Sequence, residues 1–462
     1  FYIVPRHVLG GPGFVAPSDK LRVAGIGVGG MGYNDVSGVY RSEKAEIVAL
    51  CDVDDTRAQR ARDQHPKAPY YKDFRVMLEK EEKNIDAVTV STPDHMHAVQ
   101  AMMAMKMGKH VYVQKPLSHD IYEARMLTQA AEKYKVVTQM GNQGSSGDGV
   151  RKMVEWYNAG LIGEATKVYS WTNRPVWPQG IPWPNEPMTP PSDLDWDLWL
   201  GTAPYKDYVG NLVPFNWRGW WDYGTGALGD VGCHLIDIPF RTLGLKYPTD
   251  AECSVGSVFS QMWTPDYHPE GCPASSFITL HFDATPKSKS KIEMTWSDGG
   301  IRPSHPDIIP ANEDIGGANS ANGVLIIGEK GIISTNINDS SPLMPKLYLN
   351  DGTTEMGPQS EEGFEREYGH QRLWVEACKA GFGSKEHQGL TSSFDYAGPM
   401  TETVLMGNLA IRSYMLRKEN SQGRMEFFAR KKLLWDGENM RITNLEEANQ
   451  FVGRQYRKGF EV

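Results

Sequence analysis

The stretch LRVAGIGVGGMG, residues 21–32, decides the fold of the first part of this chain. Its first six residues have the apolar composition of a short buried strand, and the remainder is a GxGxxG loop that leads into a helical pattern. A second apolar strand, residues 47–51, ends at Asp52, an acid 20 residues beyond Gly32. A lone GxGxxG is weak evidence, but this combination of strand, loop, helix and acid is the context that a dinucleotide-binding fold requires.

The three glycines of the loop have separate tasks in such a fold. Gly27 permits the tight turn, Gly29 lets the backbone approach a pyrophosphate, and Gly32 lets the following helix pack on the strand. The N-terminus of that helix then faces the phosphates. An overlapping register that starts at Gly25 also fits the pattern, but Gly25 lies inside the strand, so we prefer the later register.

Asp52 indicates which dinucleotide is bound. A carboxylate at the end of the second strand accepts hydrogen bonds from the adenosine ribose hydroxyls and repels a 2′-phosphate, which favours NAD over NADP. Arg57 and Arg60 follow it and could soften this preference. We therefore expect NAD as the cofactor.

Strands and helices alternate through the rest of this part of the chain. Apolar runs at 85–91, 110–113 and 136–140 are typical of buried strands, and helical patterns at 97–107 and 119–134 lie between them. Such alternation indicates a parallel sheet covered on both faces. We expect a doubly wound Rossmann domain over residues 21–142.

Two strand ends carry residues that are able to do chemistry. TPDHMH, residues 92–97, follows one strand, and QKP, residues 114–116, follows the next. Ligands of doubly wound sheets bind beyond the carboxyl ends of the strands. Both segments are therefore candidates for the site.

Residues 143–462 show no second series of alternating strands and helices. Short β-favouring stretches recur there, at 166–172, 276–282, 291–296 and 324–327. They favour a second α/β domain built on a large, mostly antiparallel sheet. We also expect helices around Gln371–Ala380 and Thr401–Leu416, and an extended arm over residues 1–20.

The composition excludes several classes of protein. Hydrophobic residues make up 40% and charged residues 23% of the chain, which is typical of a folded globular protein and not of a disordered one. No apolar run is long enough to cross a membrane, and a net charge of −9 gives no basic surface for nucleic acid. The 5 cysteines form no CxxC pair and no metal-binding spacing is present, so no metal is predicted.

Tryptophan is concentrated in one segment. Eight of the 13 tryptophans fall between Trp171 and Trp221, in sequence rich in Pro, Gly and Asp. Aromatic faces stack on the C–H faces of sugars, so this density favours a carbohydrate site; the alternative is that the rings pack a loop-rich domain. The candidate substrate contacts are Trp196, Trp199, Arg218, Trp220, Trp221 and Asp237.

The segment GDVGCHLID, residues 229–237, brings an acid and a histidine together. If it is helical, Asp230 and His234 are four residues apart and share a face, and Asp237 follows three residues after His234. A carboxylate can fix the tautomer of a histidine, which can then move a proton as hydride leaves a carbinol carbon. Taken alone, such a pair is more often structural than catalytic.

The order of these features resembles one family. The glycine loop, the acid after it, Thr92-Pro93 with His97, and GKHVYVQKP at residues 108–116 are similar to the Gfo/Idh/MocA oxidoreductases, which are named for glucose–fructose oxidoreductase, inositol dehydrogenase and a rhizopine-catabolism protein. The family signature is Glu-Lys-Pro, and here Gln114 replaces the glutamate, a carboxylate that could tune the lysine. The resemblance implies a Rossmann domain, a second domain with an open sheet, bound NAD and a homodimer or homotetramer.

The resemblance also implies roles for particular residues. Lys115 would bind the reacting hydroxyl and stabilise charge on its oxygen, His234 would be the acid–base residue, and Asp230 would position His234 or bind substrate. We accordingly expect cofactor contacts from Gly27, Gly29, Gly32, Asp52, Thr92, Pro93, His97 and Lys115.

Three functions are open at this point. The first is an NAD-dependent dehydrogenase of a secondary hydroxyl in a sugar, sugar derivative or cyclitol. The second, known in some members of the family, is a glycosidase or lyase that oxidises C3 transiently, eliminates the C1 substituent and restores the hydride from a retained cofactor. That route needs an additional base, for which Tyr223, Asp222 and His97 are candidates. The third is a non-catalytic sugar-binding protein with structural NAD, which the presence of Lys115 and His234 disfavours.

The start of the chain, VPRHVLGGPG at residues 4–13, looks like that of family members from Bacteroides-type bacteria. These are often preceded by a twin-arginine export signal, and that route carries folded proteins with their cofactors inside. We therefore expect a periplasmic protein, with a cytoplasmic one as the alternative. An exported member would need a retained, recycled cofactor.

Overall fold

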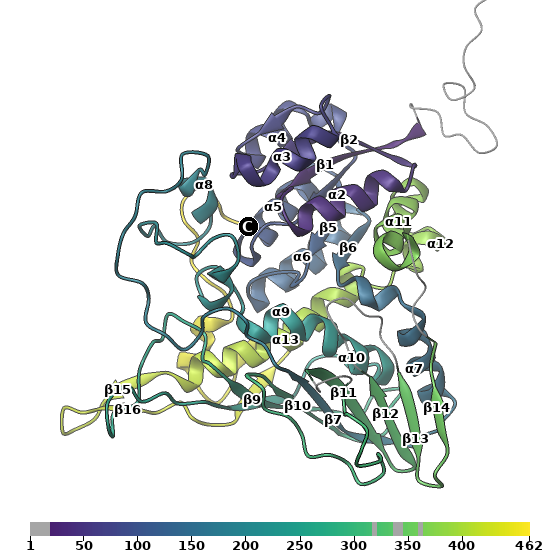
Figure 1. Ribbon diagram of the computed structural model, residues 1–462, viewed down its shortest axis with the longest axis vertical. Helices are drawn as coiled ribbons and strands as arrows, with labels where there is room; N and C mark the ends of the chain where they lie inside the picture. The colour runs from purple at the N-terminus through teal and green to yellow at the C-terminus, as the bar shows by residue number, and fades with distance from the viewer. Residues whose placement is uncertain (1–18, 317–320, 336–344, 359–363) are drawn as a thin grey trace, which may run out of the picture.

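Two β-sheets divide the chain, which the computed structural model describes for residues 19–316, 321–335, 345–358 and 364–462. The smaller sheet belongs to the N-terminal part, and the larger sheet lies below it in Figure 1, with helices α9 (Gly226–Leu235) and α13 (Phe394–Tyr414) between them. The arm expected over residues 1–20 lies outside the described residues except for its last two.

The first sheet has six strands in the order β3-β2-β1-β4-β5-β6, and its paired neighbours are all parallel. The strand order reverses between β1 and β4, which is where ligands of such sheets bind. This topology confirms the predicted doubly wound fold. Its elements are β1 (Leu21–Ile26), α2 (Met31–Arg41), β2 (Ala45–Cys51), α3 (Asp55–Gln64), β3 (Tyr70–Tyr71), α4 (Phe74–Lys80), β4 (Ala87–Val90), α5 (Asp94–Lys106), β5 (His110–Gln114), α6 (Ile121–Tyr134) and β6 (Thr138–Gly141).

The second sheet has ten strands in the order β14-β13-β12-β11-β7-β10-β9-β8-β17-β18. The β7–β10 pair is parallel and the other paired neighbours are antiparallel, which confirms the predicted mostly antiparallel sheet. Its strands are β7 (Ala165–Thr172), β8 (Asp250–Val255), β9 (Ser276–Phe282), β10 (Ile292–Ser297), β11 (Asn322–Gly328), β12 (Gly331–Thr335), β13 (Lys346–Leu349), β14 (Thr354–Met356), β17 (Leu433–Asp436) and β18 (Arg441–Ile442).

Helices accompany this sheet along its length. Helix α13 begins at Phe394, earlier than the expected start at Thr401, because its inward residues are nearly all buried and this packing outweighs the N–H donor that Pro399 lacks. Of the described helices, none is at once long enough and apolar enough to cross a membrane. The remaining elements are α7 (Asp148–Asn158), α8 (Trp196–Leu200), α10 (Asp237–Leu243), α11 (Phe364–Ala380), α12 (Lys385–Gln388) and the hairpin β15 (Arg417–Glu419) with β16 (Met425–Phe427).

Helix α11 returns to the first domain although it follows the second sheet in the chain. Its residues Trp374, Val375 and Cys378 join a buried cluster with residues of β1 and β2, and the Trp374 ring lies 5.6 Å from the ring of Tyr112 in β5. The core of the Rossmann domain is therefore completed by residues from beyond position 364. Helix α13 also packs on α6, and one hydrophobic cluster continues from the first sheet into the second.

The last described residues also return to the first domain, where the guanidinium of Arg454 pairs with buried carboxylates. Arg454 donates hydrogen bonds to Oε1 of Glu123, at 2.7 Å from Nη2, and lies 3.7 Å from Asp120. The side chain of Glu123 is fully buried, and Tyr456 donates a further hydrogen bond to it. Buried carboxylates need such partners, since an unpaired buried charge is strongly unfavourable.

Loss of this charge should destabilise the protein more than loss of an exposed one. Arg454→Met keeps the aliphatic stem but leaves Glu123 buried without its cation, so we expect the free energy of unfolding to fall by about 3–5 kcal/mol. The control is Arg441→Met, whose exposed pair with Glu446 contributes about 0–1 kcal/mol. Chemical denaturation of both variants measures the difference, and equal losses would contradict this account of the C-terminal segment.

Candidate functional site

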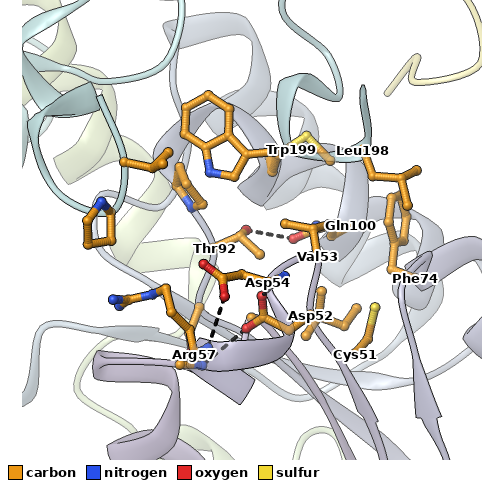
Figure 2. Close-up of a pocket in the computed structure, with 18 of the residues that line it drawn as sticks. Cys51, Asp52, Val53, Asp54, Arg57, Phe74, Thr92, Gln100, Leu198 and Trp199 are labelled. Atoms are coloured by element: carbon orange, nitrogen blue, oxygen red, sulfur yellow. Dashed lines mark hydrogen bonds between the residues drawn. The ribbon is translucent and has the colours of Figure 1, made fainter. Parts of the chain in front are cut away.

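A pocket lies at the carboxyl end of the parallel sheet, where the strand order reverses. Figure 2 shows Asp52 and Asp54 on one side of it and Trp199 on the other. The first domain contributes the ends of β1, β2, β4 and β5, and residues 194–218 of the second part supply the opposite wall. The expected site residues that line it are Gly27, Gly29, Asp52, Thr92, Pro93, Lys115, Trp199 and Arg218.

The glycine loop at the pocket is closely packed. Gly27 has a positive φ of 73°, and a Cβ atom there would lie 2.8 Å from the backbone carbonyl of Ser91. A Cβ atom at Gly32 would lie 1.7 Å from the carbonyl oxygen of Gly27. Both positions therefore need glycine, and helix α2 begins within the motif, at Met31, so that Gly32 lies in its first turn.

Asp52 ties the end of β2 to this loop. Its Oδ2 accepts hydrogen bonds from the backbone N–H groups of Val28, at 2.8 Å, and Gly29, at 3.2 Å. Burial raises the pKa of Asp52, although these N–H groups lower it. Two loop amides thus already point at an anion, and the carboxylate keeps acceptor capacity for a hydroxyl. Loop and acid together fit the pyrophosphate and ribose of a dinucleotide.

Lys115 and Asp230 form the ion pair at the centre of the site. The Lys115 Nζ donates to the Asp230 backbone oxygen at 2.7 Å and to its Oδ1 at 2.8 Å, and Arg218 Nε donates to the same Oδ1 at 3.2 Å. Burial raises the pKa of Asp230, but the two cations outweigh it and hold that pKa below its usual range. An ammonium has three N–H donors, so Lys115 keeps one for a ligand in the pocket that it lines.

Gln114, which stands where the family signature has a glutamate, contacts a buried carboxylate. Its Nε2 donates to Oδ2 of Asp35 in α2 at 2.9 Å, and Ser91 and Gln371 also donate to that carboxylate. Burial raises the pKa of Asp35 to about 6. An amide suits this position because a glutamate would place a second carboxylate against Asp35. The carboxylate that holds Lys115 comes instead from Asp230.

The expected cofactor residue His97 is buried and joins the two strand ends. Its Nδ1 lies 2.7 Å from the carbonyl oxygen of Pro116 and its Nε2 lies 2.8 Å from that of Thr92. Burial lowers the pKa of His97, and a neutral imidazole has one N–H, which it can donate to one of the two carbonyls at a time. Unlike Thr92 and Pro93, His97 is not among the residues that line the pocket.

The acid–histidine segment is helical, which meets the condition for Asp230 and His234 to share a face. Asp230 and His234 both lie in α9, one turn apart, and both are half-buried. Asp237 begins α10 and is buried: its Oδ1 accepts hydrogen bonds from Tyr396 at 2.6 Å and from Arg241 at 3.1 Å. The structure thus brings Asp230 to Lys115, while Asp237 is held by side chains away from the pocket lining.

The tryptophan-rich segment forms a compact aromatic cluster of its own. Trp196 stacks on Trp199 with ring centroids 4.9 Å apart, and Trp183 meets Trp220 edge to face at 4.8 Å. Of the four candidate tryptophans, Trp199 lines the pocket, whereas Trp196, Trp220 and Trp221 are buried and do not. Trp217, which the sequence placed in the same segment, also lines it.

The pocket also contains an acid, Asp94, for which no role was predicted from the sequence. Asp94, the first residue of α5, is buried and lines the pocket with Lys115 and Arg218, and its Oδ2 accepts a hydrogen bond from the Thr225 hydroxyl at 2.7 Å. Burial raises the pKa of Asp94 to about 6. The signal that could have found it is its place directly after Thr92-Pro93, at a strand end.

A segment of the second part closes the pocket over the end of β2. The N–H of Asp55 donates to the carbonyl of Asp193, and the N–H of Asp195 donates to that of Val53. Lys72 donates to the carbonyls of both Val53 and Asp193, which strengthens the closure. Leu194 in this segment, and Leu198 and Trp199 after it, line the pocket together with Phe460.

Family comparisons match most of the first 255 residues. The pattern described as oxidoreductase family, NAD-binding Rossmann fold, matches residues 21–142, and that described as the C-terminal alpha/beta domain of the same family matches residues 151–255. An alpha-N-acetylgalactosaminidase from Shewanella oneidensis and a glycosyl hydrolase family 109 protein from Shewanella baltica are each 30% identical over 162 residues, or 33% of this chain. The chain spans only 35% of the length of these curated relatives.

Solved structures share the fold over a greater length. An inositol dehydrogenase homolog from Azotobacter vinelandii, complexed with NADH and myo-inositol, has a TM-score of 0.57 at 16% identity and covers 85% of this chain and 96% of its own. An aldose-aldose oxidoreductase from Caulobacter crescentus, complexed with glycerol, has a TM-score of 0.56 at 14% identity and covers 88% and 100%. These likenesses show the arrangement of the two sheets.

The contacts of Asp52 give a prediction about cofactor choice. Asp52→Ala should weaken NAD binding roughly 10- to 100-fold, since a charge-assisted hydrogen bond contributes about 1.5–3 kcal/mol, and it should reduce the preference for NAD over NADP. Fluorescence titration of protein stripped of resident nucleotide measures both. Asp63→Ala, at an exposed position late in α3, is the control. An unchanged ratio of NAD to NADP affinity would refute this role of Asp52.

Proposed function

The chain belongs to the Gfo/Idh/MocA family of oxidoreductases, and we propose that it oxidises a secondary hydroxyl of a sugar, sugar derivative or cyclitol with NAD. The observation that carries this proposal is Lys115, which lines the same pocket as the glycine loop and Asp52 and is held there by an ion pair with Asp230 behind the lining. Such a pocket can bind a dinucleotide at the end formed by the glycine loop and Asp52, and it holds the ammonium of Lys115 in a fixed position at the other end.

NAD, when bound, supplies the hydride acceptor, and the residues of this chain supply the rest. Lys115 donates a hydrogen bond to the reacting oxygen and stabilises the negative charge that develops on it. Asp230 and its second cation Arg218 keep the ammonium oriented, since both cations bind one carboxylate oxygen. Arg218 is itself confined by the rings of Phe215 and Trp217, each 4.3 Å from its guanidinium.

His234 is the proposed acid–base residue for the hydroxyl proton. It lies one helical turn after Asp230, on the helix that presents the carboxylate to Lys115. A positioned acid–base group of this kind accelerates a reaction about 10²- to 10⁴-fold. Trp199 and Trp217 line the pocket and are the aromatic side chains against which a sugar ring would pack.

A second candidate function is redox-assisted cleavage of a glycoside, in which the oxidation is transient. Two observations favour it: the closure of the pocket by the segment around Asp193, which suits a retained cofactor, and the similarity of part of the chain to an alpha-N-acetylgalactosaminidase. Oxidation at C3 acidifies the C2 proton, so the C1 substituent can leave by elimination, and water then adds in its place.

Product analysis separates these two functions. The protein as isolated is incubated in D₂O with methyl and nitrophenyl glycosides and with free sugars, in parallel samples without and with added NAD, and products are read by NMR. Release of the alcohol with deuterium at C2, and no net NADH, is expected for glycoside cleavage. A keto sugar that forms only with added NAD, matched by NADH, is expected for a dehydrogenase. No reaction with any of these compounds would count against both.

Lys115→Ala should lower turnover by about 10²–10³ while NAD binding and folding persist. Removal of one preorganised donor costs about 10²–10³ in rate, and Asp230 keeps Arg218 as its partner, so the helix should stay in place. Turnover and NAD affinity of the variant are compared with those of Lys106→Ala, at an exposed position late in α5. Wild-type turnover in Lys115→Ala would remove the lysine from the mechanism.

A further inference from the structure

Glycoside cleavage by transient oxidation needs a base for the proton next to the new carbonyl. None of the three residues expected for this task is placed to perform it. Both nitrogens of His97 face backbone carbonyls, and Asp222 pairs with Lys206 at 2.6 Å. Tyr223 is fully buried in the aromatic cluster and does not line the pocket.

Asp94 meets the geometric requirements that these residues miss. It projects from the first turn of α5, at the carboxyl end of the parallel sheet, and is 5% exposed where it lines the pocket. Thr225, just before α9, donates to its Oδ2, which fixes the carboxylate between the two domains. No hydrogen bond among the described residues reaches its Oδ1, so that oxygen is available to a ligand.

The charged groups around Asp94 belong to the site already described. Lys115 and Arg218 act on it as cations and Asp230 as an anion. Asp94 differs from Asp230 in having a hydroxyl as its direct partner, where Asp230 has two cations. The two carboxylates therefore suit different tasks: one holds the lysine, and the other can take up a proton.

We propose that Asp94 is the base that removes the proton from the carbon adjacent to the carbonyl made by oxidation. The inference rests on the second function proposed for this pocket, glycoside cleavage by transient oxidation. The C–H bond breaks, its proton passes to the Asp94 carboxylate, and its electron pair forms a C=C bond in the sugar. The C1–O bond then breaks with its electron pair, and the departing oxygen takes a proton and leaves as an alcohol.

The protonation of Asp94 gives the step a characteristic pH dependence. The pKa of about 6 lies above the usual value for an aspartate, so the base form is lost as the pH falls through 6. A carboxylate with this pKa is a stronger base than an ordinary one and is still ionised at neutral pH. Proton removal should therefore decline below pH 6.

The experiment follows two events in one sample. Protein with its resident NAD is mixed in D₂O with methyl and nitrophenyl glycosides of glucose, galactose and their N-acetylated 2-amino forms. Nicotinamide absorbance reports oxidation, and NMR reports deuterium entering at the carbon next to the carbonyl. We expect Asp94→Asn to oxidise these glycosides within about tenfold of the wild-type rate but to lose deuterium incorporation by about 10²- to 10⁴-fold. Asp63→Asn, at an exposed position late in α3, is the control and should retain both.

The outcomes separate this inference from the function on which it rests. If the wild-type protein does not reduce its nicotinamide with any probe, the proposed function fails. If it does, the role of Asp94 is overturned either by a wild-type protein that incorporates no deuterium or by an Asp94→Asn variant that incorporates deuterium at the wild-type rate. Loss of oxidation and incorporation together in a folded Asp94→Asn would also overturn it, because Asp94 would then act at the hydride step.

Thr225→Val provides a second variant that leaves the carboxylate in place. The hydroxyl of Thr225 lowers the pKa of Asp94, so its removal should shift the acid limb of the incorporation profile to higher pH. Circular dichroism and thermal melting check that both variants fold. An acid limb at the wild-type position in Thr225→Val would contradict the assignment of that limb to Asp94.

Discussion

One oxygen of the Asp230 carboxylate accepts hydrogen bonds from two cations, and the arrangement of the site depends on this interaction. Lys115 reaches it from the end of β5 and Arg218 from the loop before α9, so one acid joins the two domains at the pocket. Removing three charges from water is costly, and their attraction offsets that cost only with good geometry. The depressed pKa of Asp230 reflects that geometry, and it keeps the carboxylate ionised while ligands enter and leave.

Three aspartates around the strand ends differ because their neighbours differ. Asp230 has two cations and stays ionised, whereas Asp94 and Asp35 are buried beside neutral donors and have a pKa of about 6. Environments that separate the pKa values of similar groups are characteristic of catalytic sites. Gln114 fits this pattern. It pairs with Asp35, and because its side chain is a neutral amide, Asp35 is the ionisable member of the pair.

Local patterns could be predicted from the sequence, and contacts between distant segments could not. The glycine loop and Asp52 depend on spacing within one strand–helix unit, and Lys115 follows a recognisable strand, so each could be placed from its neighbours. The return of Trp374 to the first core and the choice of Trp199 over Trp196 as a pocket wall depend on tertiary packing. Asp94 is an intermediate case. Its position at a strand end could be predicted from the sequence, but its hydrogen bond with Thr225 could not, because the two residues are 131 positions apart.

The ion pair of Arg454 with Glu123 joins residues 331 positions apart, which has a consequence for how the chain reaches its fold. During synthesis, the first domain emerges with its buried carboxylates and its α2 face still uncovered, because their partners lie at the far end of the chain. Contacts of such high sequence separation slow folding. The Rossmann unit therefore reaches its final packing only after α11 and Arg454 have been made, so its completion is a late event in the folding of the chain.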